Sequence, residues 1–177
     1  VSSSAGKSPV KRVILLAGCA QRALDPEINA STIRVLNRLG VEVIVRKEAH
    51  CCGALAHHIG ETKQANAAMR AAIYAWHEEI TAGAIDAIIV NASGCGTMVK
   101  DYGHLMRHDA VMAPMGAAIS AKAKDVSELV ADLDLASIIQ PHVTSTCGPL
   151  AYHSACSLQH GQKIYDLPLA LLRKAGF

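Results

Sequence analysis

The sequence predicts an α/β fold, with a mostly parallel sheet flanked by helices. Three short apolar runs, Val13–Leu16, Val41–Val45 and Asp86–Val90, alternate with helical periodicity over 27–39 and 61–81. Apolar residues recurring every three to four positions indicate helices, and continuous apolar runs are typical of strands covered on both faces. Strand–helix–strand units of this length favour parallel pairing. The composition, 51% hydrophobic but only 3% aromatic, suits alanine-rich helices packed closely on a sheet.

Each predicted strand is followed by a loop that contains cysteine. The first run ends in Ala17-Gly18-Cys19, the second leads to His50-Cys51-Cys52-Gly53, and the third ends in Asn91–Gly96, which includes Cys95. Because ligands gather at the carboxyl edge of an open parallel sheet, we expect these cysteines to converge there. Further helices are predicted over about Thr97–Arg107 and Ser127–Leu133.

The chain is predicted to contain one complete module and the start of a second. Residues 1–9 are small and polar, which indicates a linker, and residues 10–140 form the first module. Residues 141–177 repeat its opening: VILLAGC and LNRLG around Cys19 correspond to LAYHSAC and LLRKAG around Cys156. We therefore expect one further strand and one further helix, and a chain that is cut from a longer protein.

Charge and hydropathy exclude several classes of function. The net charge is +2 with acids and bases interspersed, so no nucleic-acid surface is indicated. No run reaches the roughly 18 apolar residues of a membrane span, and the amino end lacks a signal-peptide pattern, so a cytoplasmic location is predicted. Gly94 and Gly96 form a GxG, but Val99 stands where a dinucleotide fingerprint needs its third glycine, so neither NAD nor flavin is expected on this chain.

The cysteines point to metal or redox chemistry. Six cysteines without an export signal are unlike a disulfide framework, because the cytosol keeps thiols reduced. Cys51 and Cys52 are adjacent, and a bond between neighbours strains disulfide geometry. Neighbouring thiolates can instead bind separate metal atoms of one iron–sulfur cluster. Cluster ligation by Cys19, Cys51, Cys52 and Cys95 is the favoured interpretation.

These residues resemble a known family. The pattern of Cys19, Cys51-Cys52-Gly53 and Cys95 resembles the cysteine-rich CCG domain, which occurs twice in a subunit of heterodisulfide reductase and in iron–sulfur subunits of glycolate and lactate oxidation systems. The segments LLAGCAQ, DPEINASTIRVL, HCCGALAHHIG, NASGCGTMVKDYGHLMRHD and YHSACSLQHGQK are similar to glycolate oxidase iron–sulfur subunits, and the resemblance covers about residues 11–177.

The resemblance implies a role in electron transfer. A flavin-containing partner subunit would oxidise glycolate to glyoxylate, and this chain would pass the electrons on. A ferredoxin-like domain would precede residue 1, and Cys156 would be the first metal ligand of the second module. Association with the inner face of the membrane would arise through the complex.

One position departs from the family pattern. The wider family closes each module with C-x-x-C, and Ala92 replaces the first of these cysteines. The five-cysteine non-cubane cluster of heterodisulfide reductase therefore cannot be reproduced unchanged. Four thiolates fit a 4Fe–4S cluster, a cluster with an outside ligand, or zinc. A site that binds no metal is a further alternative.

Other residues have both plain and functional readings. Cys147 is expected to be a small buried hydrophobe. His50 is expected to be a polar loop histidine, with metal binding as the alternative, and His57 and His58 to be solvated or capping residues before a helix. Lys100, Asp101 and Tyr102 either tune the cluster or belong to a plain amphipathic helix. Alternative functions are lactate oxidation, a heterodisulfide reductase-like reaction, or a zinc-bound or metal-free docking domain without redox activity.

Overall fold

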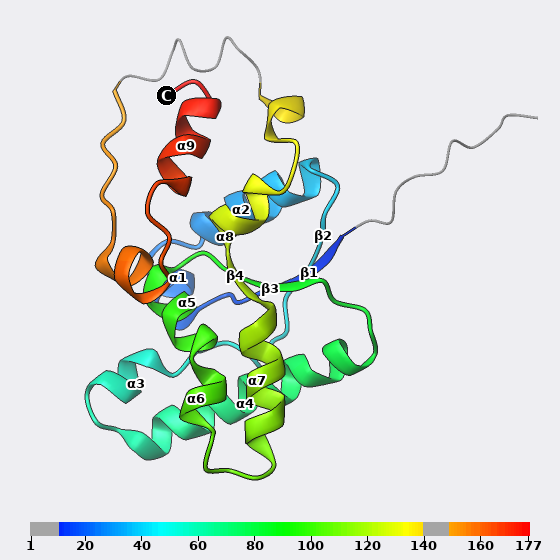
Figure 1. Cartoon of the computed structure of the whole chain (residues 1–177), viewed down its shortest axis with the longest axis vertical. Coiled ribbons are helices and arrows are strands. Elements are labelled where there is room, and N and C mark those ends of the chain that lie inside the picture. The colour runs from blue at the N-terminus through cyan, green and yellow to red at the C-terminus, as the bar shows by residue number, and fades with distance from the viewer. Residues whose placement is uncertain (1–10, 140–148) are drawn as a thin grey trace, which may run out of the picture.

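The computed structural model describes residues 11–139 and 149–177 and contains a four-stranded parallel sheet (Figure 1). The strands are β1 (Arg12–Leu15), β2 (Glu42–Ile44), β3 (Ala87–Val90) and β4 (Ala123–Asp125), arranged in the order β2-β1-β3-β4. All three pairings are parallel. The predicted α/β fold class is confirmed.

The strand order reverses direction between β1 and β3. The chain passes outward from β1 to β2, then returns across β1 to form β3 and β4. At such a reversal the loops after the two central strands leave on opposite sides of the sheet and open a crevice at its carboxyl edge. Two of the cysteine loops, those after β1 and β3, flank this crevice.

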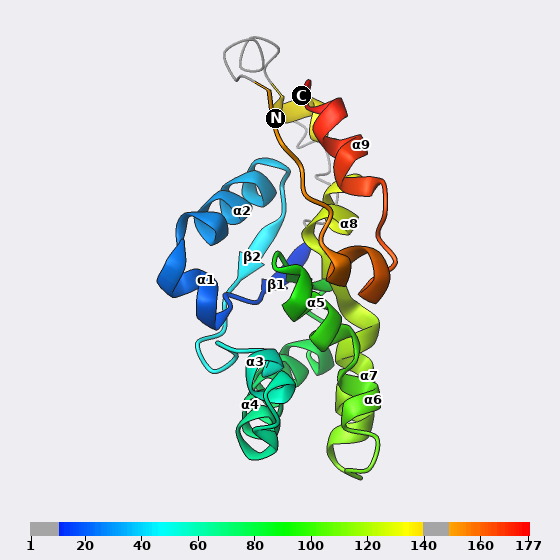
Figure 2. The same ribbon diagram turned by 90° about the vertical axis from the view of Figure 1, so that its left-hand side faces the viewer.

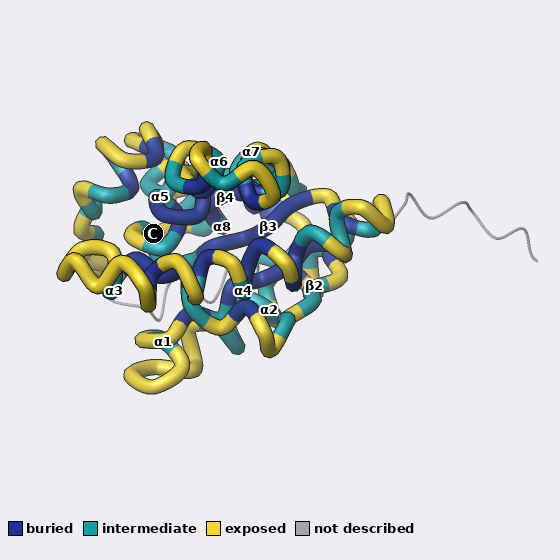
Figure 3. The backbone as a smooth tube through the Cα atoms, turned by 90° about the horizontal axis from the view of Figure 1, so that it is seen from below, coloured by how far each residue is buried: buried dark blue, intermediate teal, exposed yellow. Residues whose placement is uncertain are grey.

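Both faces of the sheet are covered, as its continuous apolar strands predict. Val13 and Leu15 of β1 pack in one apolar cluster, whereas Ile14 belongs to the other, because successive side chains of a strand point to opposite faces. Helices α2 (Glu27–Arg38), α8 (Val126–Ala131) and α9 (Leu167–Lys174) cover the first face; α4 (Thr62–Thr81) and α7 (Met112–Lys122) cover the second (Figure 1). Figure 3 shows β3 buried along its length.

Shorter elements lie at the carboxyl edge and in the connections. These are α1 (Cys19–Leu24), α3 (Ala54–His58), α5 (Ser93–Lys100), α6 (Tyr102–Leu105), the 3-10 turn η1 (Leu135–Ile138) and the π-type turn η2 (Ser157–Gly161). Figure 2 shows α1, α3 and α5 gathered at the same end of the strands.

The structure confirms the three predicted strands and the helices predicted over 27–39, 61–81 and 127–133, with small shifts at their ends. The prediction of one helix over Thr97–Arg107 is wrong in its bounds. This segment contains two helices, α5 and α6, and α5 begins at Ser93. Cys95 therefore lies in the first turn of a helix and not in the preceding loop. Neither β4 nor α7 is predicted, because β4 is a three-residue edge strand with charged Lys124 and Asp125, and α7 contains proline and glycine.

The opening of the expected second module is only partly as predicted. Residues 149–155, where a strand is expected, lie outside the sheet, because they pair with neither edge strand, β2 nor β4. The helix is present as α9. The linker at 1–9 and Cys147 lie outside the described residues.

Gly53 of the Cys-Cys-Gly sequence sets how closely α3 approaches α4. Its φ is +85°, and a Cβ at this position would lie 2.9 Å from the carbonyl oxygen of Ala65 on α4. A side chain here would meet both backbone strain and a backbone clash.

We therefore predict that Gly53→Ala lowers the free energy of unfolding by about 2–3 kcal/mol. The matched control is Gly83→Ala, since Gly83 also has a positive φ, +68°, but has no atom within 4 Å of the added Cβ. Urea unfolding of both variants separates the clash from the backbone strain. Equal losses would show that α4 moves aside without cost.

Candidate functional site

The four predicted cysteines lie at the carboxyl edge of the sheet, on three connections. Cys19 is the first residue of α1 and follows β1, Cys51 and Cys52 precede α3, and Cys95 lies in the first turn of α5 after β3. Cys19 is exposed, Cys51 and Cys95 are half-buried, and Cys52 is buried. The predicted convergence of strand ends is thus realised in the fold.

The thiols form two contacting pairs. The Sγ atoms of Cys51 and Cys19 are 3.6 Å apart, and the backbone N–H of Gly53 donates to Cys51 Sγ at 3.4 Å. Cys52 and Cys95 are the second pair, and the interaction between their side chains is the largest cause of the pKa shift of each thiol, while burial and the charges of Cys19 and Cys51 act to raise the pKa of Cys95. Cys156 is exposed at the start of η2, and its ligand role remains a prediction.

The environment keeps protons on two of these thiols. Its hydrogen bond to Cys95, followed by burial, raises the pKa of Cys52, while burial raises the pKa of Cys51. Accepting the bond from Cys52 lowers the pKa of Cys95. Among the described residues, no Lys, Arg or His side chain contributes to these shifts. Four thiolates at this edge therefore need positive charge from a bound group, and binding it releases protons.

The donor set fits an iron–sulfur cluster. It consists of sulfur alone, and adjacent Cys51 and Cys52 can reach separate metal atoms of a multinuclear centre. Within 11–139 and 149–177, no three His, Cys, Asp or Glu side chains are arranged to hold one metal ion.

An apolar groove adjoins the exposed pair of thiols. Its volume is about 560 Å³, and its lining contains no charged Asp, Glu, Lys or Arg side chain. Leu55 and Ile59 of α3 and Ala68 of α4 form its walls beside Cys19 and Cys51. Apolar side chains next to the sulfurs lower the local dielectric constant, which is one determinant of the potential of a bound cluster.

Tyr102 is the buried polar residue that supports the cysteine pair. Its hydroxyl donates to the backbone carbonyl of Cys52 at 2.9 Å, and its ring stacks on Trp76 at a centroid distance of 6.4 Å. Burial and the nearby charges of the thiols raise its pKa. Of the three residues singled out from the sequence, only Tyr102 reaches the pair, because Lys100 pairs with Glu128 at 2.6 Å and Asp101 is exposed.

Asn91 joins two of the three cysteine-bearing connections, those after β1 and β3, and sequence reasoning missed it. Its side-chain oxygen accepts from Gln21 of α1 at 3.0 Å, and its amide donates to Asn29 at 3.0 Å and Thr32 at 2.9 Å, both on α2. Asn29 in turn donates to the carbonyl of Ala17 at 2.7 Å. The end of β3 is thus tied to the segment that carries Cys19. The only local signal for Asn91 is a polar residue directly after an apolar strand.

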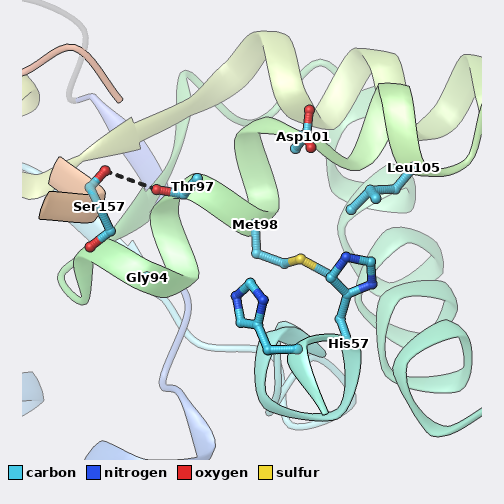
Figure 4. Close-up of a pocket in the computed structure, with 8 residues that line it drawn as sticks. His57, Gly94, Thr97, Met98, Asp101, Leu105 and Ser157 are labelled. Atoms are coloured by element: carbon cyan, nitrogen blue, oxygen red, sulfur yellow. Dashed lines mark hydrogen bonds between the residues drawn. The ribbon is translucent and has the colours of Figure 1, made fainter. Parts of the chain in front are cut away.

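None of the described histidines is among the causes of the thiol pKa shifts. His50 is exposed and lines the groove together with Cys19 and Cys51. His57 and His58 are exposed and precede α4, as predicted, and they also form the end of the short helix α3. Together with Met98 and Asp101, His57 and His58 line a cavity of about 230 Å³ (Figure 4).

Comparison with known proteins identifies the same pattern. Residues 13–100 match the family model described as a cysteine-rich CCG domain. The chain is 40% identical over 167 residues to the glycolate oxidase iron-sulfur subunit of Escherichia coli, covering 94% of this chain and 40% of that protein. It is 30% identical over 163 residues to the probable glycolate oxidase iron-sulfur subunit of Bacillus subtilis, covering 92% and 35%. It is 27% identical over 165 residues to lactate utilization protein A of Bacillus pumilus, covering 91% and 64%.

These matches confirm the resemblance predicted from the sequence. The chain spans less than two thirds of the length of each of these relatives. No solved structure shows significant similarity to it. None of the helices within the described ranges combines the length and apolar character that crossing a bilayer requires.

Tyr102→Phe tests the support of the cysteine pair. The ring and its stacking remain, but the carbonyl of Cys52 loses its donor, and a buried unpaired acceptor costs about 1–3 kcal/mol. We predict a loss of that size in the free energy of unfolding, measured with urea on metal-free protein. Tyr74→Phe is the control, since Tyr74 is 49% exposed. A loss no larger than that of Tyr74→Phe would contradict the supporting role.

Asn91→Ala tests the link between the connections. It removes three hydrogen bonds at once, and we predict that it lowers the free energy of unfolding by about 2–4 kcal/mol. We also predict slower cross-linking of Cys19 to Cys51 by dibromobimane, measured by fluorescence and peptide mapping. Asn66→Ala, at an exposed position of α4, is the matched control. Unchanged cross-linking would show that Asn91 does not hold the Cys19 segment.

Proposed function

Since residues 13–100 form a cysteine-rich CCG domain, we propose that this chain is the cluster-binding part of an iron–sulfur electron-transfer subunit in a glycolate-oxidising complex. The observation that carries the proposal is the meeting of four thiols at one sheet edge, with no cationic side chain of the described residues among the causes of the pKa shifts of Cys51, Cys52 and Cys95. The 40% identity to the E. coli glycolate oxidase iron-sulfur subunit supports the choice of complex.

The ligands that we assign are Cys19, Cys51, Cys52 and Cys95, and the group is a 4Fe–4S cluster. Four cysteines match the four thiolates that such a cluster uses. Ala92 lies at the N-cap of α5 and offers no fifth ligand. When bound, the cluster would supply one-electron transfer. Zinc is the alternative occupant, and it would leave a docking domain without redox activity.

The protein's own residues hold and tune this site. The groove places apolar side chains of α3 and α4 beside Cys19 and Cys51. Tyr102 fixes the backbone of Cys52, and Gly53 donates its N–H to Cys51 Sγ, a bond that stabilises negative charge on sulfur. Substrate oxidation belongs, in this proposal, to flavin on a partner subunit, and this chain carries neither flavin nor NAD.

We further propose that the chain is the middle of a longer subunit, with a ferredoxin-like domain before it and the rest of a second CCG module after it. The sequence repeat around Cys19 and Cys156 supports the second module. In this repeat Gly176 corresponds to Gly40, and Phe177 to Val41, which lies directly before β2 in the first module. Both helices end in the same glycine-closed turn, which also ends α3 and α4 and therefore follows from the glycine.

Lactate oxidation is the second candidate activity, because a lactate utilization protein A relative covers 91% of this chain at 27% identity. A heterodisulfide reductase-like reaction is disfavoured by Ala92. We place the complex in the cytoplasm, at the inner face of the membrane through its other subunits.

Anaerobic expression of residues 1–177 tests the cluster. We predict stoichiometric iron and sulfide with a broad visible absorption band, and loss of all three in Cys51→Ser. Cys156→Ser is the matched control and keeps them, since Cys156 lies outside the two thiol pairs. If the wild-type protein is colourless and contains one zinc or no metal, the electron-transfer role is wrong and the docking-domain alternative is favoured. Glycolate- and lactate-dependent reduction of the cluster in the assembled complex then distinguishes the two substrates.

A further inference from the structure

The turn η2 (Ser157–Gly161), together with Gln162, packs on the first turn of α5, where Cys95 lies. Ser157 Oγ donates to Ser93 Oγ at 2.7 Å, and Thr97 Oγ1 donates to the carbonyl of Ser157 at 3.0 Å (Figure 4). Gln162 Nε2 donates to the carbonyl of Ser93 at 3.0 Å. Three hydrogen bonds therefore join the start of the proposed second module to Ser93 and Thr97, each of which lies two positions from Cys95.

Two glycines allow this close approach. A Cβ on Gly96 would lie 2.5 Å from Gln162 Nε2, and a Cβ on Gly161 would lie 2.6 Å from Thr97 Oγ1. Both distances are shorter than real Cβ contacts, so a larger residue would displace the side chain of Gln162 or of Thr97 from its place in this contact. The glycines of SGCG and LQHGQ thus serve one interface between distant parts of the chain.

Helix α5 has no side-chain cap bond within the described residues. Its N-cap residue is Ala92, which has no side-chain oxygen to accept from the first-turn N–H groups. Cys95 is the third residue of this turn. The bonds from Ser157 and Gln162 reach the hydroxyl and the carbonyl of Ser93, so they do not cap the turn but hold it against η2.

Gln162 has the features of a residue kept for its N–H group. It is only 8% exposed, and its Oε1 is buried without a hydrogen-bond partner. An unpaired buried oxygen is costly, so an apolar side chain of the same length would suit the burial better. The bond from Nε2 to Ser93 is the compensating interaction in this structure.

We propose that Gln162 is a positioning residue for Cys95, through which the opening of the second module completes the thiol site of the first. Gln162 acts on Cys95 through the backbone of Ser93 and does not itself bind the metal. Only the predicted effect on a bound cluster rests on the proposed cluster-binding function. The effect of Gln162 on Cys95 itself can be measured in metal-free protein.

The test compares Gln162→Met with Gln159→Met in the 177-residue chain. Methionine keeps the length and bulk of glutamine but has no N–H. Gln159 is the matched control, since it belongs to the same turn and donates to Ser154 at 2.9 Å, away from α5. In metal-free protein, alkylation of Cys95 by iodoacetamide, followed by peptide mass spectrometry, is expected to be about fivefold faster in Gln162→Met, the factor that corresponds to ~1 kcal/mol. Gln159→Met is expected to match the wild type.

The loaded protein gives the second readout. Gln162→Met is expected to shift the reduction potential and the electron paramagnetic resonance signal of the cluster at unchanged iron content. If Cys95 is alkylated in Gln162→Met at the same rate as in the wild type, the proposal is overturned, because packing alone would then explain why Gln162 is buried at this position. If circular dichroism shows that Gln162→Met does not fold, Ser157→Ala decides: faster alkylation of Cys95 supports the positioning role, and an unchanged rate overturns it. If the chain binds no cluster, the proposed function is wrong. The alkylation rate of Cys95 still decides the role of Gln162 in that case.

Discussion

Parallel pairing of β1 with both β2 and β3 is the constraint on which the candidate site depends. It brings three carboxyl ends to one edge, although the cysteines that follow them are separated by 31 residues (20–50) and 42 residues (53–94). The pairing of β1 with β3 extends to a bond from Leu16 N to the carbonyl of Ile89 at 3.0 Å. Only two residues then separate Leu16 from Cys19. The reversal of strand order between β1 and β3 provides the crevice between their loops.

Thiols cannot hold such a site by themselves, because thiolates repel one another and a buried thiolate is poorly solvated. The scaffold instead uses neutral side chains. Asn91 ties the end of β3 to α1 and α2, Tyr102 fixes the backbone of Cys52, and Gln162 fixes that of Ser93. A lysine close to the sulfurs would stabilise free thiolates, but Lys100 pairs with Glu128 instead. In the proposed cluster site the positive charge would come from the bound group, and cluster binding would be coupled to deprotonation of the cysteines.

The sequence is informative where one local signal determines the structure. The apolar runs identify β1, β2 and β3, and the parallel order of strands predicts that Cys19, Cys51, Cys52 and Cys95 meet. β4 escapes prediction because a short edge strand with Lys124 and Asp125 has no apolar run, and its position depends on pairing with β3. Asn91, Tyr102 and Gln162 carry little or no local signal, since their partners lie 50 to 70 positions away in sequence. The start of α5 is misplaced by the sequence pattern because Ser93-Gly94 resembles a turn, and contacts from η2 override that preference.

The segment that repeats in the sequence therefore does not coincide with the segment that forms the cysteine site. Repetition places a boundary near residue 140, but Cys95 lies in a helix turn whose first residue is bound by Ser157 and Gln162. The bonds from Ser157 and Gln162 go to the hydroxyl and the carbonyl of Ser93, so they anchor the first turn of α5 without capping its N–H groups. The hydrogen-bonding groups of Ser93 then serve as the contact between modules. In a two-module electron carrier, this arrangement would let the second module affect the ligand geometry of the first without contributing a ligand to it.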